Sequence, residues 1–197
     1  MKFHYTGAFD GNIENLPKRE HHPNAVPFKE AKNIKTFSII VNLASILIMI
    51  LFAIPYVILA KEYIINSRWG IFTGALCSLL TLFPHELLHA VCFKDDVYMY
   101  TAFSKGLLFV VGNEDMSKAR FIFMSLLPNL VFGVVPYIIA LIFPNLVMLG
   151  IMGIVCIGMG AGDYVNVFNA ATQMPKGAKT YLCGFNSYWY KKNEVKE

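Results

Sequence analysis

The sequence predicts an all-α integral membrane protein with about four transmembrane helices and a β-hairpin between the second and third. Two observations lead to this fold class. The 197 residues are 56% hydrophobic and 15% charged, whereas a soluble domain carries about a quarter charged residues. The charges also gather at the two ends of the chain and in connecting stretches, with long apolar runs between them. We therefore expect one membrane-embedded domain.

Four apolar runs are long enough to cross a bilayer, which takes roughly 20 residues of helix. They cover residues 36–60, 71–93, 119–143 and 145–170. Because Pro144 and Asn145 are all that separates the last two runs, we expect them to form a tight antiparallel pair. Residues 1–35 and 171–197 are expected to be polar tails outside the membrane.

Basic residues flank these runs unequally, and such residues favour the cytoplasmic side. The two tails and the connection between the second and third runs are rich in Lys and Arg, whereas the connection between the first two has only Lys61 and Arg68. Both termini should therefore face the cytoplasm. This bias accounts for the formal net charge of +4. The basic residues therefore indicate a lipid bilayer as the partner, and no nucleic-acid partner is expected.

The stretch 97–111, between the second and third runs, has the composition of a β-hairpin. Its two halves are β-branched and aromatic, and Ser104, Lys105 and Gly106 between them are typical turn residues. Such a hairpin either covers a cavity or offers an edge strand to an extended substrate.

The second run contains His85-Glu86-Leu87-Leu88-His89, an H-E-x-x-H motif. Four residues make just over one helical turn, so both imidazoles share one face and can chelate one zinc ion. Glu86 projects to the edge of this face, where it can take a proton from water. Pro84 should kink the run or begin a new helical segment there. The alternative is a set of polar groups that only hold helices together.

Asp163 is the expected third metal ligand. Catalytic zinc takes three protein ligands and leaves a fourth position open. Ionisable side chains are costly inside a membrane, and in the apolar interiors of the four runs we find His85, Glu86, His89 and Asp163. Both helices run from the outside inwards in the predicted topology, and the groups lie at similar depths. Glycines of the fourth run, Gly153, Gly158, Gly160 and Gly162, would allow the close helix contact that a short aspartate needs.

Two amides are candidates for positioning a ligand or a substrate carbonyl. Asn166 lies one turn beyond Asp163, and Asn129 follows Pro128 in the third run. Either could orient a ligand carboxylate, and either could equally be an interhelical hydrogen-bonding group.

On these residues the sequence resembles the site-2 protease clan of intramembrane metalloproteases, and more closely a family of small bacterial membrane zincin peptidases with an HELLHA motif and a downstream Gly-Asp. The resemblance covers roughly residues 36–169 and implies zinc as cofactor, His85, His89 and Asp163 as ligands, and Glu86 as catalytic glutamate. It also implies the bacterial plasma membrane as location. The chain departs from the clan at Tyr164, where a glycine is usual.

The sequence thus predicts an enzyme that hydrolyses a peptide bond of a membrane protein or peptide, in or beside the membrane. Two other classes stay open: a catalytically silent zincin-like scaffold, and a divalent-metal transporter. A scaffold would hold zinc without depending on Glu86, and a transporter would bind metal weakly and exchange it.

Overall fold

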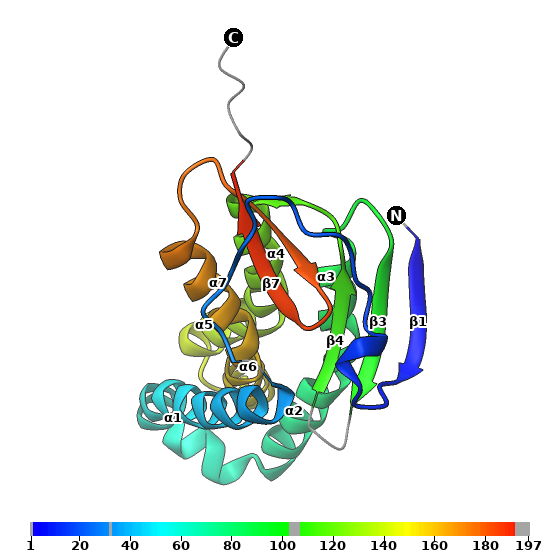
Figure 1. Ribbon diagram of the computed structural model, residues 1–197. Helices are drawn as coiled ribbons and strands as arrows, with labels where there is room; N and C mark the ends of the chain where they lie inside the picture. The colour runs from blue at the N-terminus through cyan, green and yellow to red at the C-terminus, as the bar shows by residue number, and fades with distance from the viewer. Residues whose placement is uncertain (1, 32, 103–106, 192–197) are drawn as a thin grey trace. The chain divides into compact units, whose positions relative to one another are not determined.

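The chain forms two compact units, and each is described by itself. The computed structural model describes residues 2–31, 33–102 and 107–191 (Figure 1). One unit comprises Met1–Ser38, His89–Ser125 and Val165–Glu197, and it contains all the strands. The other comprises Ile39–Leu88 and Leu126–Tyr164, and it is helical.

The helices follow the predicted apolar runs. In chain order, the elements that cover the first three runs are α1 (Ile34–Asn66), α2 (Arg68–Leu80), α3 (Leu82–Ala90), α4 (Lys118–Pro128), the π-helix η3 (Asn129–Val134) and α5 (Val135–Ile142). Among the described residues, three stretches are long and apolar enough to cross a membrane: Lys35–Asn66, Arg68–Ala90 and Lys118–Ile142. Apolar helices of this length are compatible with a membrane protein.

The fourth run differs from the prediction, because it is not one helix. It forms α6 (Val147–Met159) and α7 (Ala161–Gln173), which meet at a bend of 49°. Gly160 lies at the break, and a Cβ added there would overlap the Asn129 Oδ1. The bend therefore occurs where the backbone passes directly against a side chain of η3.

Close backbone contact also organises the rest of the helical unit. A Cβ added at Gly153 of α6 would lie 2.7 Å from the backbone nitrogen of Tyr137 in α5. The Tyr137 hydroxyl donates to the Phe52 carbonyl of α1 at 2.9 Å. Away from the buried Tyr56 and Ala60, α1 exposes large apolar side chains, and Leu47 and Ile58 are 68% and 76% exposed. This apolar surface is what a lipid-facing helix would present.

The predicted hairpin is present in the other unit. Strands β3 (Val97–Ala102) and β4 (Leu107–Gly112) pair antiparallel, and β1 (Phe3–Ala8) adds to β3 in parallel. The predicted turn, residues 104–106, lies outside the described residues.

A second sheet shows that the all-α prediction was too narrow. Its strand order is β2 (Val26–Pro27), β7 (Asn186–Tyr190), β6 (Lys179–Cys183), β5 (Met116–Ser117), with every pair antiparallel. Gly184, with φ of +62°, lies between β6 and β7 and permits the tight turn. Both predicted tails therefore contribute strands.

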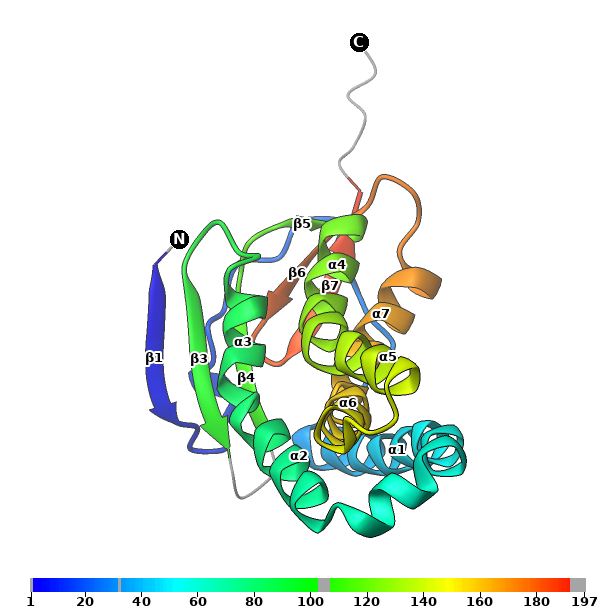
Figure 2. The same cartoon turned by 180° about the vertical axis from the view of Figure 1, so that it is seen from behind.

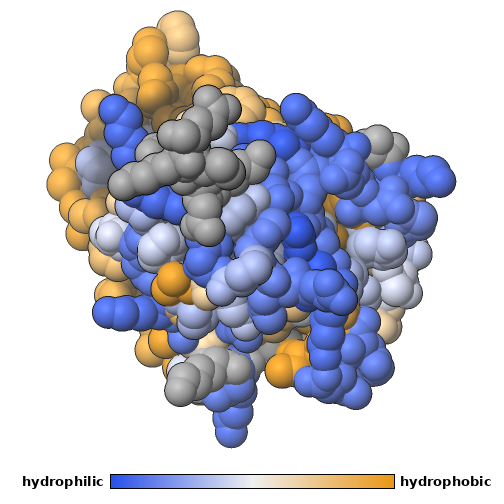
Figure 3. Space-filling model, turned by 45° about the horizontal axis from the view of Figure 1, so that its top comes forward, coloured by the Kyte–Doolittle hydropathy of each residue, from blue (hydrophilic) through white to orange (hydrophobic). Residues whose placement is uncertain are grey.

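The segment before β2 is bound to this sheet by polar and aromatic contacts. Arg19 Nη1 donates to Asp115 Oδ1 at 2.9 Å, and the Tyr190 hydroxyl donates to Asp115 Oδ2 at 2.8 Å. The His22 ring stacks on Tyr190 with centroids 3.7 Å apart. Hydrophilic side chains dominate the face in Figure 3, which brings the top of Figure 1, with β7, towards the viewer. The N-terminal segment is thus packed against the sheet, where a solvated tail was expected.

The pKa of Asp115 gives a test of these contacts. Burial acts to raise this pKa, but the Tyr190 hydroxyl, Arg19 and His22 together lower it below its ordinary value of 3.8. A lowered pKa in the folded state means stabilisation that is present above 3.8 and is lost as the pH falls through the folded value. Asp115→Asn should therefore lower the free energy of unfolding by about 1–3 kcal/mol at pH 7.

The measurement is denaturant unfolding of the detergent-purified protein at pH 7 and pH 3. The difference between wild type and Asp115→Asn should shrink at pH 3. Asp95→Asn, at an exposed carboxylate, is the control and should have little effect. An equal loss from Asp115→Asn at both pH values would contradict this account.

Candidate metal centre

The H-E-x-x-H motif occupies the short helix α3. Thr81 separates α3 from α2, and the His85 amide donates to the Thr81 carbonyl at 2.8 Å. Pro84 lies in the first turn of α3, where its missing N–H costs no helical hydrogen bond. The new helical segment predicted at Pro84 is therefore present, and it begins two residues earlier, at Leu82.

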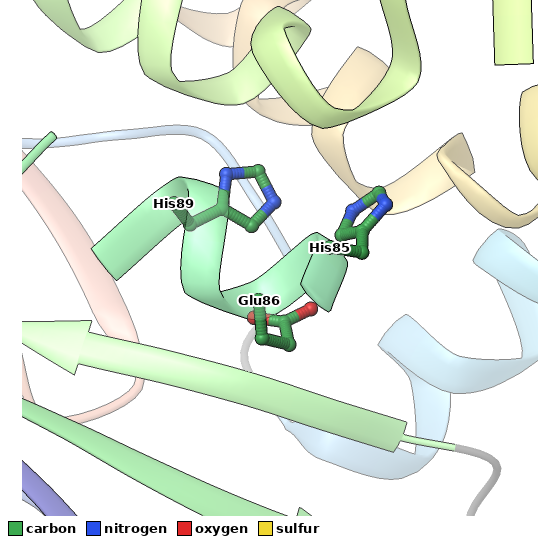
Figure 4. Close-up of side chains that lie close together, drawn as sticks. All are labelled: His85, Glu86 and His89. Atoms are coloured by element: carbon green, nitrogen blue, oxygen red, sulfur yellow. The ribbon is translucent and has the colours of Figure 1, made fainter. Parts of the chain in front are cut away.

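The three motif side chains form a compact cluster. One ligand atom from each of His85, Glu86 and His89 can be chosen so that all lie within 4.8 Å of one another. Figure 4 shows both imidazole rings projecting to one side of α3, with the Glu86 carboxylate below them in that view. Glu86 and His89 are buried, at 9% and 6% exposure. Two neighbouring imidazoles and a carboxylate in a buried setting are a donor set suited to a metal ion.

His89 is oriented by a backbone carbonyl. Its Nδ1 lies 2.9 Å from the Met124 carbonyl oxygen of α4. A carbonyl oxygen accepts and cannot donate, so Nδ1 carries a proton in this contact, and Nε2 is the ring nitrogen left to bind a metal. Metal-ligating histidines are usually held in this way, through the ring nitrogen that does not bind the metal.

His85 contacts the predicted third ligand. Its Nε2 lies 3.2 Å from Asp163 Oδ2, and the two side chains are 12% and 14% exposed. Two ligand atoms on a tetrahedral zinc, each at roughly 2.0–2.1 Å from the ion, are about 3.3 Å apart. The observed separation therefore suits two ligands of one zinc ion, as well as a direct hydrogen bond.

The Asp163 carboxylate is also bound by Asn129. The Asn129 Nδ2 donates to Asp163 Oδ2 at 2.7 Å, and Asn129 is 2% exposed. Asn129 begins the π-helical stretch η3, and π-bulges occur frequently at functional sites. Asp163 lies in the first turn of α7, where the helix dipole favours a negative charge.

The structure thus brings Asp163 and Asn129 together with His85, and it places Asn166 one turn further along α7, outside these contacts. Two features of the site were not predicted from the sequence. The Met124 carbonyl is a backbone group, which no residue type signals. The role of Gly160 is to leave space for the Asn129 side chain, whereas the sequence suggested contact between helix backbones.

The chain therefore belongs, by fold and site, to the class of mostly helical proteins with a buried His-Glu-His cluster on one helix. Comparison with family models identifies the family: the model described as "Putative zincin peptidase" matches residues 78–179. This match covers more than half of the chain, so the chain belongs to that family, and the family implies zinc. Comparisons with curated proteins and with solved structures gave no match.

The contact between Gly160 and Asn129 leads to a testable expectation. Gly160→Ala would place a methyl group on the Asn129 amide and so displace the donor that holds Asp163. Loss of such an outer partner typically lowers metal affinity by about 10–100-fold. We expect the same range for Asn129→Ala, measured by zinc competition with a chelator on monodisperse protein.

Gly153→Ala is the matched control, because it adds a methyl group at another tight glycine contact. It should lower thermal stability without a selective loss of zinc affinity. Equal zinc affinity in wild type, Gly160→Ala and Asn129→Ala would show that Asn129 does not support the metal centre.

Proposed function

We propose that the protein is an intramembrane zinc metalloprotease, similar to site-2 proteases, that cuts a peptide bond in or beside the membrane. The observation that carries this proposal is the 3.2 Å contact between His85 Nε2 and Asp163 Oδ2. It adds a carboxylate from a second helix to the two histidines of α3. Membership of the zincin peptidase family supports the same reaction class.

In this proposal His85, His89 and Asp163 hold the zinc ion. Zinc supplies Lewis acidity at such a site, which polarises a substrate carbonyl and makes water a nucleophile near neutral pH. The Met124 carbonyl binds Nδ1 of His89, which leaves Nε2 as the ring nitrogen that would bind the metal. Asn129 keeps the Asp163 carboxylate directed towards His85.

Glu86 is the proposed general base. Its carboxylate belongs to the same cluster as the two imidazoles and is 9% exposed. It accepts the proton of the attacking water and later donates that proton to the nitrogen of the leaving amine. Because the second transfer returns Glu86 to its starting state, one carboxylate serves both halves of the hydrolysis.

The apolar helices support a membrane location for this chemistry. Among the described residues, three long helical stretches have the length and composition of a membrane span, and the bent pair α6 and α7 could form a fourth. The resemblance to bacterial membrane proteins leads us to propose the bacterial plasma membrane as the location, and the distribution of basic residues leads us to propose that both termini lie on the cytoplasmic side.

An extended membrane protein or peptide is the proposed substrate. The β4 strand is at one end of the sheet order β1-β3-β4, so a substrate strand could pair with its outer edge. Proteases favour such extended segments, because main-chain pairing then presents the peptide bond while side-chain pockets select the sequence.

Glu86→Gln tests the proposed reaction directly. The amide cannot accept the proton, so cleavage should fall by about 10²–10⁴-fold, while zinc should still bind through the other three residues. The measurement compares new protein N-termini in membranes from cells that express wild type, Glu86→Gln or Glu62→Gln, with zinc content determined in parallel. Glu62 is an exposed glutamate of α1 and serves as the matched control.

Wild type and Glu62→Gln should produce the same new termini, and Glu86→Gln should not. Zinc binding with no Glu86-dependent cleavage would favour the silent scaffold. Cleavage at the wild-type rate by Glu86→Gln would eliminate this mechanism.

A further inference from the structure

The first turn of α4 carries two cations that reach the ends of other helices. Lys118 is the first residue of α4, and its Nζ donates to the carbonyl oxygens of Ala171 and Met174 at 2.8 and 2.9 Å. These carbonyls belong to the last turn of α7 and the residue after it. The last carbonyls of a helix lack partners within the helix, so an ammonium group there is a favourable cap.

Arg120 binds the turn that directly follows α3. Its Nε donates to the Cys92 carbonyl at 3.1 Å, and its Nη2 donates to the same oxygen. Cys92 lies two residues beyond the end of α3, and its amide donates to the His89 carbonyl at 3.0 Å. The guanidinium group therefore holds the turn that directly follows a predicted metal ligand.

Glu114 fixes Arg120 from the other side. Arg120 Nη2 forms an ion pair with Glu114 Oε1, and the Glu114 side chain is 4% exposed. Glu114 Oε2 also accepts from the backbone amides of Lys94 and Asp95, the latter at 2.7 Å. The segment that follows α3 is thus bound both through its carbonyl at Cys92 and through two of its amides.

The same stretch of chain contacts the ligand side chains themselves. The Met124 carbonyl, within α4, accepts from His89. Asn129, directly after α4, donates to Asp163. In the strand-bearing unit, the end of α3 and the end of α7 lie on either side of α4 in both ribbon views (Figures 1 and 2). Residues 118–129 therefore make two kinds of contact with each ligand-bearing segment, one at the end of the helix or the turn directly after it and one at a ligand.

We propose that α4 is the positioning helix of the metal centre, with Lys118 and Arg120 as positioning residues that hold α7 and α3 by their C-terminal ends. This inference rests on the proposed function, since it takes His85, His89 and Asp163 as zinc ligands. Neither cation is a ligand. Each acts by fixing the helix from which a ligand projects.

The carbonyls that the two cations bind lie at different distances from the metal ligands. The proposal therefore predicts which of the two cations matters more for zinc affinity. Cys92 is three residues from His89 and its amide donates to the His89 carbonyl at 3.0 Å, whereas Ala171 is eight residues from Asp163, about 12 Å along α7. A shift at the end of α3 therefore displaces His89 almost directly. A shift at the end of α7 is reduced before it reaches Asp163, so Arg120 matters more than Lys118.

The experiment uses the full chain purified in detergent, and it measures zinc affinity together with the visible spectrum of the cobalt-substituted protein. Cobalt absorption reports the geometry of the ligands, so it separates positioning from stability. Arg120→Met should lower zinc affinity about tenfold, at the lower limit for outer partners of a ligand, and should shift the cobalt bands. Lys118→Met should have a smaller effect, and Arg120→Lys and Lys118→Arg should recover part of each loss.

Arg19→Met is the matched control. Arg19 forms an ion pair with Asp115 in the same unit, and its side chain is 27% exposed, against 25% for Arg120. It should lower the melting temperature without changing zinc affinity or the cobalt bands. If Arg120→Met does the same, the proposal is overturned.

Should Arg120→Met fail to fold, Arg120→Lys and Glu114→Gln provide the comparison, and unchanged zinc affinity and cobalt bands in both would overturn the proposal. A wild-type protein that binds neither metal is a different result. It would remove the proposed function, and the positioning role with it.

Discussion

The free-energy cost of burying ionisable side chains in apolar helices must be offset by polar partners. This constraint underlies the arrangement of the candidate metal centre. An unpaired charge in such a setting costs several kcal/mol. Here His85 lies against Asp163, Asn129 donates to the same carboxylate, and His89 donates to the Met124 carbonyl. Each partner reduces the cost of burial and also fixes the direction of a side chain, so stability and preparation for metal binding have the same origin.

Irregular features of the helices occur close in sequence to the residues that make these contacts. The turn at Thr81 begins α3, the π-helical stretch begins at Asn129, and the break at Gly160 leaves room for the Asn129 amide. A regular helix through Gly160, with a side chain at that position, would occupy the space of the group that holds Asp163. At Gly160 the backbone therefore departs from regularity where polar side chains meet.

The sequence predicts local features well because their physics is local. The spacing of His85 and His89 fixes their common face whatever surrounds the helix, and composition alone shows the apolar runs and the hairpin of residues 97–111. Asp163 could be chosen because ionisable residues are so rare in the apolar runs. Its role as a ligand stays a prediction, as do those of His85, His89 and Glu86.

Features that depend on contacts between residues far apart in the sequence were not predicted. Val26 pairs with Trp189 in the second sheet, and β2 is too short to show a strand pattern. The bend at Gly160 lies inside a continuous apolar run, so composition gives no sign of it. The cations of α4 were counted as evidence for orientation, whereas their contacts with the ends of α3 and α7 depend on the three-dimensional structure.

The central claim is that zinc is held by ligands from two helices, and its most direct test is the zinc content of purified wild-type protein and of Asp163→Ala, determined by elemental mass spectrometry. We predict near-stoichiometric zinc in the wild type and much less in Asp163→Ala, with Asp96→Ala, at an exposed carboxylate, equal to wild type. Equal zinc in Asp163→Ala and wild type would remove Asp163 from the site, and absence of zinc from all three proteins would contradict the metal centre itself.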